Sequence, residues 1–197
     1  MFVMTVDQRR SRRERDRVPD LVARFTQTPL LRPFDRTAGD EVQAVTDDPE
    51  VVVDVVMELV ALGGWSVGVG VGAVEEPLPM VTRAGRGPAF EAARTAVTRA
   101  KRAPGNVSLA GGDPSRAADA SAVLALLAIV VARRSPEGHE AVALVRSGVS
   151  QSDIAEQLGI SKQAVSQRLS VAEWQAERDG RAAAVHLVAA VERAEAA

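Results

Sequence analysis

Carboxylates at two distant points of the chain are the residues best suited to chemistry. Asp7 follows the apolar run Phe2 to Val6, and Asp40 stands with Glu41 just after Gly39 in the stretch TAGDEVQAV. A glycine beside an aspartate is common in polar turns, because both residues tolerate the backbone that a turn requires. The alternative is a metal-binding hairpin tip, since Mg²⁺ and Mn²⁺ prefer oxygen ligands. The choice depends on whether the fold brings Asp7 and Asp40 together.

The elements around these carboxylates predict how they are positioned. Apolar patterning and turn residues predict the order β-α-β-β-α-β-α-β, with strands at 2–6, 30–36, 42–45, 65–74 and 106–110 and helices at 19–27, 49–62 and 88–102. The first six elements match the ferredoxin-like split βαβ arrangement, in which the first strand lies beside the third. Asp7 and Asp40 are therefore expected at the same edge of an α+β fold.

Two further stretches of the N-terminal half have unusual composition. Between Trp65 and Val74, valine alternates with glycine or serine, which predicts a strand with one bare face on which another element packs closely. Residues 8–17, QRRSRRERDR, contain six arginines. Such a run is typical of a solvated segment. The alternative is a phosphate-binding loop, in which Arg10 and Arg12 bind phosphate or neutralise the two aspartates.

From residue 113 onward the sequence contains no further strand pattern. Asp113 and Pro114 begin a long apolar helix, about residues 114–134. We therefore expect a sheet-containing domain at 1–112, a connecting helix at 113–135, and a helix-turn-helix domain with a C-terminal helix at 136–197.

The stretch VSQSDIAEQLGISKQAVSQRL predicts the helix-turn-helix. Ser150 caps a first helix at 151–158, Gly159 supplies the turn, and Ser161 caps a second helix. The outward positions of the second helix, our DNA-binding candidates, are Ser161, Lys162, Gln163, Ser166, Gln167 and Arg168. Gln can pair with adenine, while Arg and Lys reach guanine or phosphate. The alternative is a helical hairpin with a polar outer face.

The charge balance predicts weak DNA binding by a single copy. The net charge of the chain is -2, and acids surround the helix-turn-helix: Glu137, Glu140, Asp153, Glu156, Glu173 and Glu177. A homodimer would double the phosphate contacts and read a palindromic site. In the final helix, Val185, Leu187, Val188 and Val191 are interpreted as a dimer seam rather than core packing.

Composition and targeting signals predict a cytoplasmic protein. The chain has no cysteine, which excludes disulfides and thiolate metal sites. The longest uninterrupted apolar run, Ala122 to Ala132, is too short to span a bilayer, so no membrane partner is expected. His139 and His186 have no partner at metal-ligand spacing.

Several motifs together resemble the SatD family of bacterial proteins: TVDQRRSRRERDRV, AGDEVQAV, WSVGVGVG, GRGPAFEAAR and the helix-turn-helix. The N-terminal half is more distantly similar to class III nucleotide cyclase and GGDEF domains. That similarity implies a ferredoxin-like palm, with Asp7 and Asp40 at the metal positions and Arg94 as a residue that contacts a nucleotide phosphate. The asparagine of those palms falls on Phe90 or Glu91, and no purine-selecting Lys/Asp pair is visible.

These features favour a DNA-binding transcriptional regulator with a degenerate cyclase-like domain that senses a ligand, such as a nucleotide, or dimerises. One alternative is a metal-dependent nucleotidyl cyclase or transferase that uses Mg²⁺ or Mn²⁺ on Asp7 and Asp40. Another is a protein-interaction module. The regulator is favoured over the enzyme, because the missing asparagine would have stabilised the departing pyrophosphate.

Overall fold

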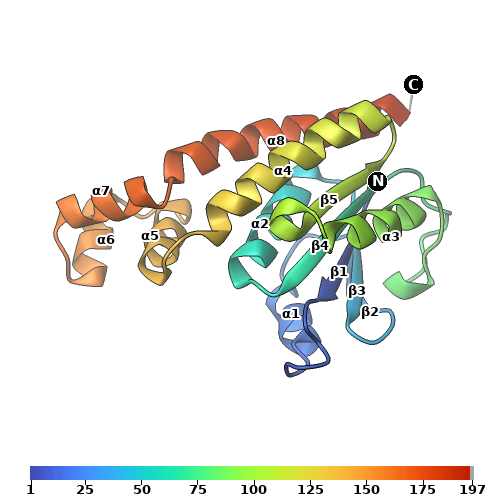
Figure 1. Cartoon of the computed structure of the whole chain (residues 1–197), viewed down its shortest axis with the longest axis horizontal. Coiled ribbons are helices and arrows are strands. Elements are labelled where there is room, and N and C mark those ends of the chain that lie inside the picture. The colour runs from blue at the N-terminus through green and yellow to red at the C-terminus, as the bar shows by residue number, and fades with distance from the viewer. Residues whose placement is uncertain (196–197) are drawn as a thin grey trace.

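The strands form one five-stranded mixed sheet in the order β2-β3-β1-β4-β5 (Figure 1). The computed structural model describes the backbone of residues 1–195 and places the strands at β1 Phe2–Gln8, β2 Arg32–Arg36, β3 Glu41–Thr46, β4 Trp65–Val71 and β5 Val107–Gly111. β1 runs antiparallel to both β3 and β4, and β5 runs parallel to β4. The predicted pairing of the first strand with the third is therefore confirmed.

Eight α-helices accompany the sheet in the described residues, which makes the chain an α+β protein: α1 Val18–Arg24, α2 Pro49–Leu62, α3 Pro88–Ala100, α4 Pro114–Ala132, α5 Pro136–Arg146, α6 Gln151–Leu158, α7 Lys162–Val171 and α8 Trp174–Glu195. Local signals set several of their starts. The side chain of Asp48 accepts from the Glu50 N–H at the start of α2, and that of Asp113 accepts from the Arg116 N–H at the start of α4. These caps satisfy N–H groups that have no partner inside the helix.

The two faces of the sheet are covered by different helices. On one face, Phe2, Met4 and Val6 of β1 share a core with residues of α1, α2, α4 and α8. On the other face α3 lies directly on β4. A Cβ atom at Gly68 would lie 2.1 Å from the Val97 nitrogen, and one at Gly70 would lie 2.1 Å from the Ala89 oxygen. The predicted close approach to the glycine face is thus confirmed.

The C-terminal helix packs back onto the sheet-bearing part of the chain. α8 lies antiparallel beside α4, with Gly180 close to Leu127 and Gly112 close to Val191 (Figure 1). Ala184, Val188 and Val191 are fully buried in the same core as β1. The interpretation of Val188 and Val191 as a dimer seam is therefore wrong, because the core of the same chain already buries them, and Val185 and Leu187 are partly buried against that core.

α4 is a core helix of this fold. By length and composition it is apolar enough to cross a membrane, and the run Ala122 to Ala132 forms only part of its 19 residues. One of its faces is buried against other elements through Ala117, Ala120, Leu124, Leu127, Ala128 and Val131. On another face Leu126 is 64% exposed.

Candidate nucleic-acid interface and polar cleft

Helices α5, α6 and α7 form a three-helix unit with its own small core. Its fully buried side chains include Ile154 of α6 and Val165 of α7, and its members are Ala141, Val142, Ile154, Val165, Leu169 and Ala172. This cluster is separate from the core beneath the sheet. The unit therefore holds α6 and α7 in a fixed relation by its own packing.

The turn between α6 and α7 follows the predicted sequence signals. α6 ends at Gly159, whose φ of 63° and ψ of 33° are left-handed and favour glycine. Ser150 caps α6, since its Oγ accepts from the Asp153 N–H. Ser161 caps α7, and its Oγ accepts from the Ala164 N–H at 3.1 Å. The predicted bounds of the first helix, 151–158, and the predicted caps are confirmed.

The outer face of α7 presents most of the DNA-binding candidates to solvent. The exposed members are Ser161, Lys162, Gln163, Ser166 and Gln167. Arg168 differs, because it is half-buried and its Nη1 lies 3.7 Å from Oε2 of Glu140 on α5. No local pattern in the sequence indicates this ion pair, because it depends on how α5 packs beside α7. The exposed face remains free of acids from Ser161 to Val171.

At the opposite part of the molecule, Asp7 and Asp40 line one open cleft of about 600 Å³. The Gln8 N–H, next to Asp7, donates to the Asp40 carbonyl at 3.2 Å, which fixes the hairpin tip beside the end of β1. The other lining residues are Gln8, Arg9, Arg10, Ser11, Arg12, Arg13, Ser66 and Lys101. The structure thus brings together both aspartates and both predicted phosphate-binding arginines, Arg10 and Arg12.

The charge of Asp7 is compensated by a residue that sequence reasoning missed. Lys101 Nζ donates to Asp7 Oδ2 at 2.7 Å, and Asp7 is largely buried. Lys101 directly follows α3, and only the packing of α3 over β4 brings it to the end of β1. Among the described residues no three His, Cys, Asp or Glu side chains are grouped to hold a metal. With an ammonium already on Asp7, this donor set does not fit a two-metal centre.

The arginine-rich loop after β1 is held in place by one buried side chain. Gln8, 2% exposed, donates from Nε2 to the Arg15 carbonyl at 2.7 Å and accepts at Oε1 from the Arg17 N–H at 2.8 Å. Arg17 in turn lies over the ring of Trp65, with its Cζ 5.3 Å from the ring centroid. The loop is therefore preorganised above the cleft.

The cleft also offers hydrogen-bond donors without partners. The hydroxyl of Ser66 is buried at the cleft and has no hydrogen-bond partner among the described residues. The backbone N–H groups of Arg10, Ser11 and Arg12 donate to no acceptor in the part of the chain that the structure describes. Unpaired donors together with several guanidinium groups favour an anion in this cleft.

Two residues that the cyclase-like resemblance implicated lie elsewhere. Arg94 is exposed on α3 and does not line the cleft. Phe90, at the place of the missing asparagine, is 2% exposed and packs in the core between α3 and the sheet. The structure therefore does not bring Arg94 to Asp7.

Comparison with protein-family models, with curated proteins and with solved structures finds no match for this chain. Functional inference therefore rests on the geometry of the three-helix unit and of the cleft.

Proposed function

We propose that this chain is a DNA-binding transcriptional regulator, and that α7 enters the major groove of double-stranded DNA as the recognition helix. The observation that carries the proposal is the acid-free, exposed face of α7, held by a preformed helix-turn-helix. Gln163 and Gln167 would face base edges, and Lys162 would reach phosphate or guanine. Ser161, at the N-terminus of α7, would bind a phosphate.

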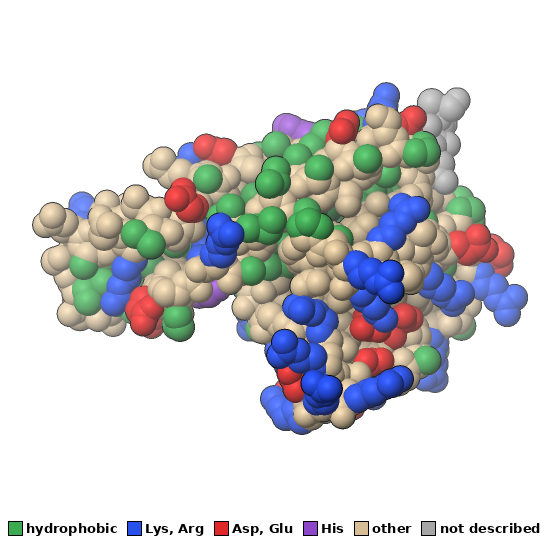
Figure 2. All heavy atoms as spheres, in the orientation of Figure 1, with side chains coloured by type: hydrophobic (Ala, Val, Ile, Leu, Met, Phe, Trp, Pro, Cys, Tyr) green, Lys and Arg blue, Asp and Glu red, His purple; other side chains and the backbone are tan. Residues whose placement is uncertain are grey.

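We further propose that the regulator works as a homodimer. A chain of net charge -2 has little attraction for DNA in one copy, and two copies read two half-sites about 34 Å apart. The surface that supports dimerisation is a groove of about 950 Å³ between α3 and α4, in which β5 presents the free edge of the sheet. Figure 2 shows hydrophobic side chains along α4 on this face. An unpaired strand edge can pair with its own copy.

We propose that the sheet-bearing part is a ferredoxin-like palm of a SatD-like cytoplasmic protein. The strand order β2-β3-β1-β4 with antiparallel neighbours supports this assignment, and β5 is then an addition at the edge. In this view the palm is degenerate. It lacks the asparagine, and the ammonium of Lys101 pairs with the Asp7 carboxylate at the place where a metal ion would bind.

A second candidate function is binding of a phosphate-bearing nucleotide in the Asp7 cleft without turnover. The specific observation in its favour is the unpaired Ser66 hydroxyl below the arginine-rich loop. The measurement is release of pyrophosphate from ATP or GTP with Mn²⁺. We expect none. Release that disappears in Asp40→Asn would instead make the protein a nucleotidyl cyclase or transferase.

The DNA-binding proposal is tested by selecting bound duplexes from a random pool with the full chain. Each chosen sequence is then compared with a scrambled duplex by fluorescence anisotropy. The variant Gln163→Ala with Gln167→Ala should lose discrimination between the two, since each lost base contact costs about 1–3 kcal/mol. Gln27→Ala, an exposed glutamine far from α7 in the sequence, is the matched control and should bind like the wild type.

Two outcomes would overturn the assignment. One is full discrimination by the double variant while its helical content and melting temperature are unchanged. The other is failure of the wild-type chain to enrich any duplex, which would favour a protein-interaction module in place of a DNA-binding one.

A further inference from the structure

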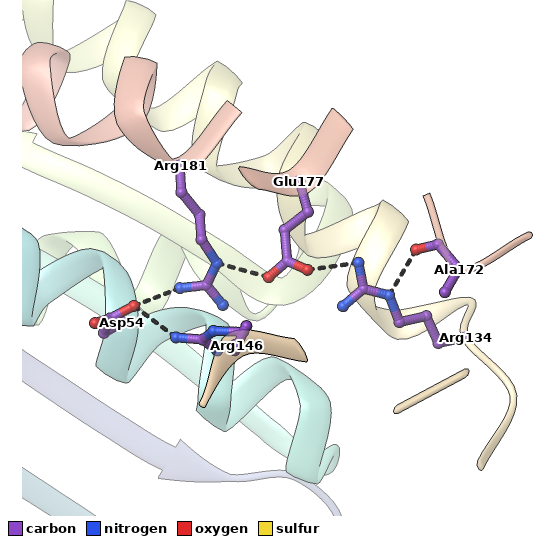
Figure 3. Close-up of polar contacts among 6 residues, drawn as sticks. All are labelled: Asp54, Arg134, Arg146, Ala172, Glu177 and Arg181. Carbon is purple, nitrogen blue, oxygen red and sulfur yellow. Dashed lines mark hydrogen bonds and ion pairs between the residues drawn. The ribbon is translucent and has the colours of Figure 1, made fainter. Parts of the chain in front are cut away.

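A row of charged side chains joins the three-helix unit to the sheet-bearing part (Figure 3). Oδ1 of Asp54 on α2 accepts from Arg146 Nη2 of α5 at 2.9 Å and from Arg181 Nη1 of α8 at 2.7 Å. Arg181 Nε donates to Glu177 Oε1 at 2.6 Å. Ion pairs therefore connect α2, α5 and α8, which come from both parts of the molecule.

The row continues to the end of α4. Arg134, whose side chain is 3% exposed, places Nη2 2.5 Å from Oε2 of Glu177 and donates from Nε to the Ala172 carbonyl at 2.8 Å. Glu177 itself is 1% exposed. Charges buried this deeply are costly unless they are paired, so each partner holds the other in place. The ends of α4, α7 and α8 are thereby fixed together.

The row carries one positive charge in excess. Three guanidinium groups, of Arg134, Arg146 and Arg181, share the two carboxylates of Asp54 and Glu177 (Figure 3). Among the described residues Arg146 makes only the hydrogen bond to Asp54, so its remaining N–H groups are available. Burial lowers the pKa of Arg181, and the positive charge of Arg146 lowers it further, whereas Glu177 and Asp54 act in the opposite direction. An added anion would relieve this excess.

A cavity of about 530 Å³ lies beside the excess charge. Arg146 and Arg181 form a polar part of its wall, and the exposed side chains of Ala61, Leu62 and Ala143 form an apolar part. The volume falls within the range of small-molecule sites, which combine apolar walls with a few placed polar groups. The wall thus presents a charged end and a hydrophobic end to one occupant.

We propose that this cavity binds a small organic anion with an apolar body. The anionic group binds the available N–H groups of Arg146 near Arg181, and the body lies against Leu62 and Ala143. A planar guanidinium suits a carboxylate because it can donate two parallel hydrogen bonds. The apolar wall distinguishes such an occupant from an inorganic anion, which gains nothing from hydrophobic burial.

The position of the cavity makes it a regulatory site. Leu62 belongs to α2 below the sheet, and Ala143 and Arg146 belong to α5 of the three-helix unit. An occupant contacts both parts at once and stabilises the arrangement seen here over any other. A ligand that favours one arrangement shifts the population toward it. The orientation of α6 and α7 is thereby linked to the concentration of the anion.

The test is isothermal titration calorimetry of the full chain with benzoate, benzamide, acetate and inorganic phosphate. We expect benzoate to bind best. Benzamide lacks the charge and acetate lacks the apolar body, so each should bind at least about tenfold more weakly, the equivalent of one lost interaction. Phosphate binding as tight as that of benzoate would overturn the assignment of an apolar body.

Three variants locate the site. Arg146→Gln should weaken benzoate binding by about tenfold, which is the loss of a charge-assisted hydrogen bond. Ala143→Phe, at an exposed position of the cavity wall, should fill the cavity and abolish binding while Arg146 is retained. Arg133→Gln, an exposed arginine outside the cavity, is the matched control and should leave binding unchanged.

Benzoate binding that Arg146→Gln and Ala143→Phe leave unchanged would overturn the proposal, as would the absence of benzoate binding by the wild-type chain. These measurements require no DNA. Their failure is therefore distinguishable from a failure of the proposed DNA-binding function.

Discussion

Glu177 and Arg181 lie one helical turn apart on α8 and meet through Oε1 and Nε at 2.6 Å, beneath the junction between the sheet-bearing part and the three-helix unit. Burial alone would raise the pKa of Glu177, but Arg181 and Arg134 outweigh burial, and its pKa lies below the ordinary value. The carboxylate therefore stays charged at neutral pH and is the anchor of the whole row of ion pairs.

Replacing this anchor should destabilise the protein strongly. Glu177→Gln leaves Arg134 and Arg181 buried without their shared carboxylate, and breaking a buried pair in this way costs about 3–5 kcal/mol. The measurement is the free energy of unfolding in urea. Glu173→Gln, at an exposed acid one turn earlier, is the control and should change it little. A loss as small as that of the control would show that Glu177 does not anchor the row.

The half-buried His139 should make stability depend on pH. Burial is the main cause that lowers its pKa from the ordinary 6.5, and the charge of Arg134 adds to it, while Glu177 acts in the opposite direction. Because the folded state then binds the proton less readily than the unfolded state, the contribution of His139 is present above pH 6.5 and is lost as the pH falls toward its lowered pKa.

Between about pH 7.5 and about pH 5.5, the unfolding free energy of His139→Gln should therefore fall less than that of the wild type. His186→Gln, at the other, exposed histidine, serves as the control. Identical pH profiles for the wild type and His139→Gln would contradict the expectation.

The bare face of β4 should not accept a methyl group. Gly70→Ala would place a Cβ atom 2.1 Å from the Ala89 oxygen of α3, where backbone rather than a mobile side chain must give way. Overpacking of this kind costs about 1–3 kcal/mol. The comparison variant is Gly138→Ala on α5, whose nearest neighbour would be the Ala172 Cβ at 3.4 Å. Equal melting temperatures of the two variants would show that α3 can move away from the sheet.

The proposed dimer should depend on Leu126. This side chain is 64% exposed in the groove between α3 and α4, and Leu126→Asp would place a charge in the proposed contact between the two copies. Light scattering should give twice the chain mass for the wild type and the single-chain mass for the variant. Met80→Asp changes an even more exposed apolar residue outside the groove and should remain dimeric. A wild-type monomer, or a dimeric Leu126→Asp, would remove this surface from consideration.

Features that neighbouring residues determine were well predicted from the sequence. The bounds 49–62 and 151–158 were correct, because Asp48 and Ser150 cap those helices and Gly63 and Gly159 end them. The glycine pattern of β4 likewise predicted the close approach of another element. In each case the signal and the structure that it sets lie within a few residues of one another.

Features that depend on distant partners were missed. The ion pair between Lys101 and Asp7 joins residues 94 positions apart, and that between Arg168 and Glu140 depends on helix packing. Val188 and Val191 show an apolar helical pattern that serves a core and a dimer seam equally well. Only the position of α4 beside them decides between the two, and no local pattern encodes that position.

The antiparallel return of α8 along α4 has a consequence for how the molecule is built. The three-helix unit is an insertion into the sheet-bearing part, since the chain leaves that part through α4 and re-enters it through α8. Met1 and the end of α8 accordingly lie together on the sheet side, where the α-ammonium of Met1 pairs with Glu192 (Figure 1). A chain shortened after α7 would lose Ala184, Val188 and Val191 from the core beneath the sheet. Excision of α5 to α7 with a short loop between α4 and α8 would leave that core whole.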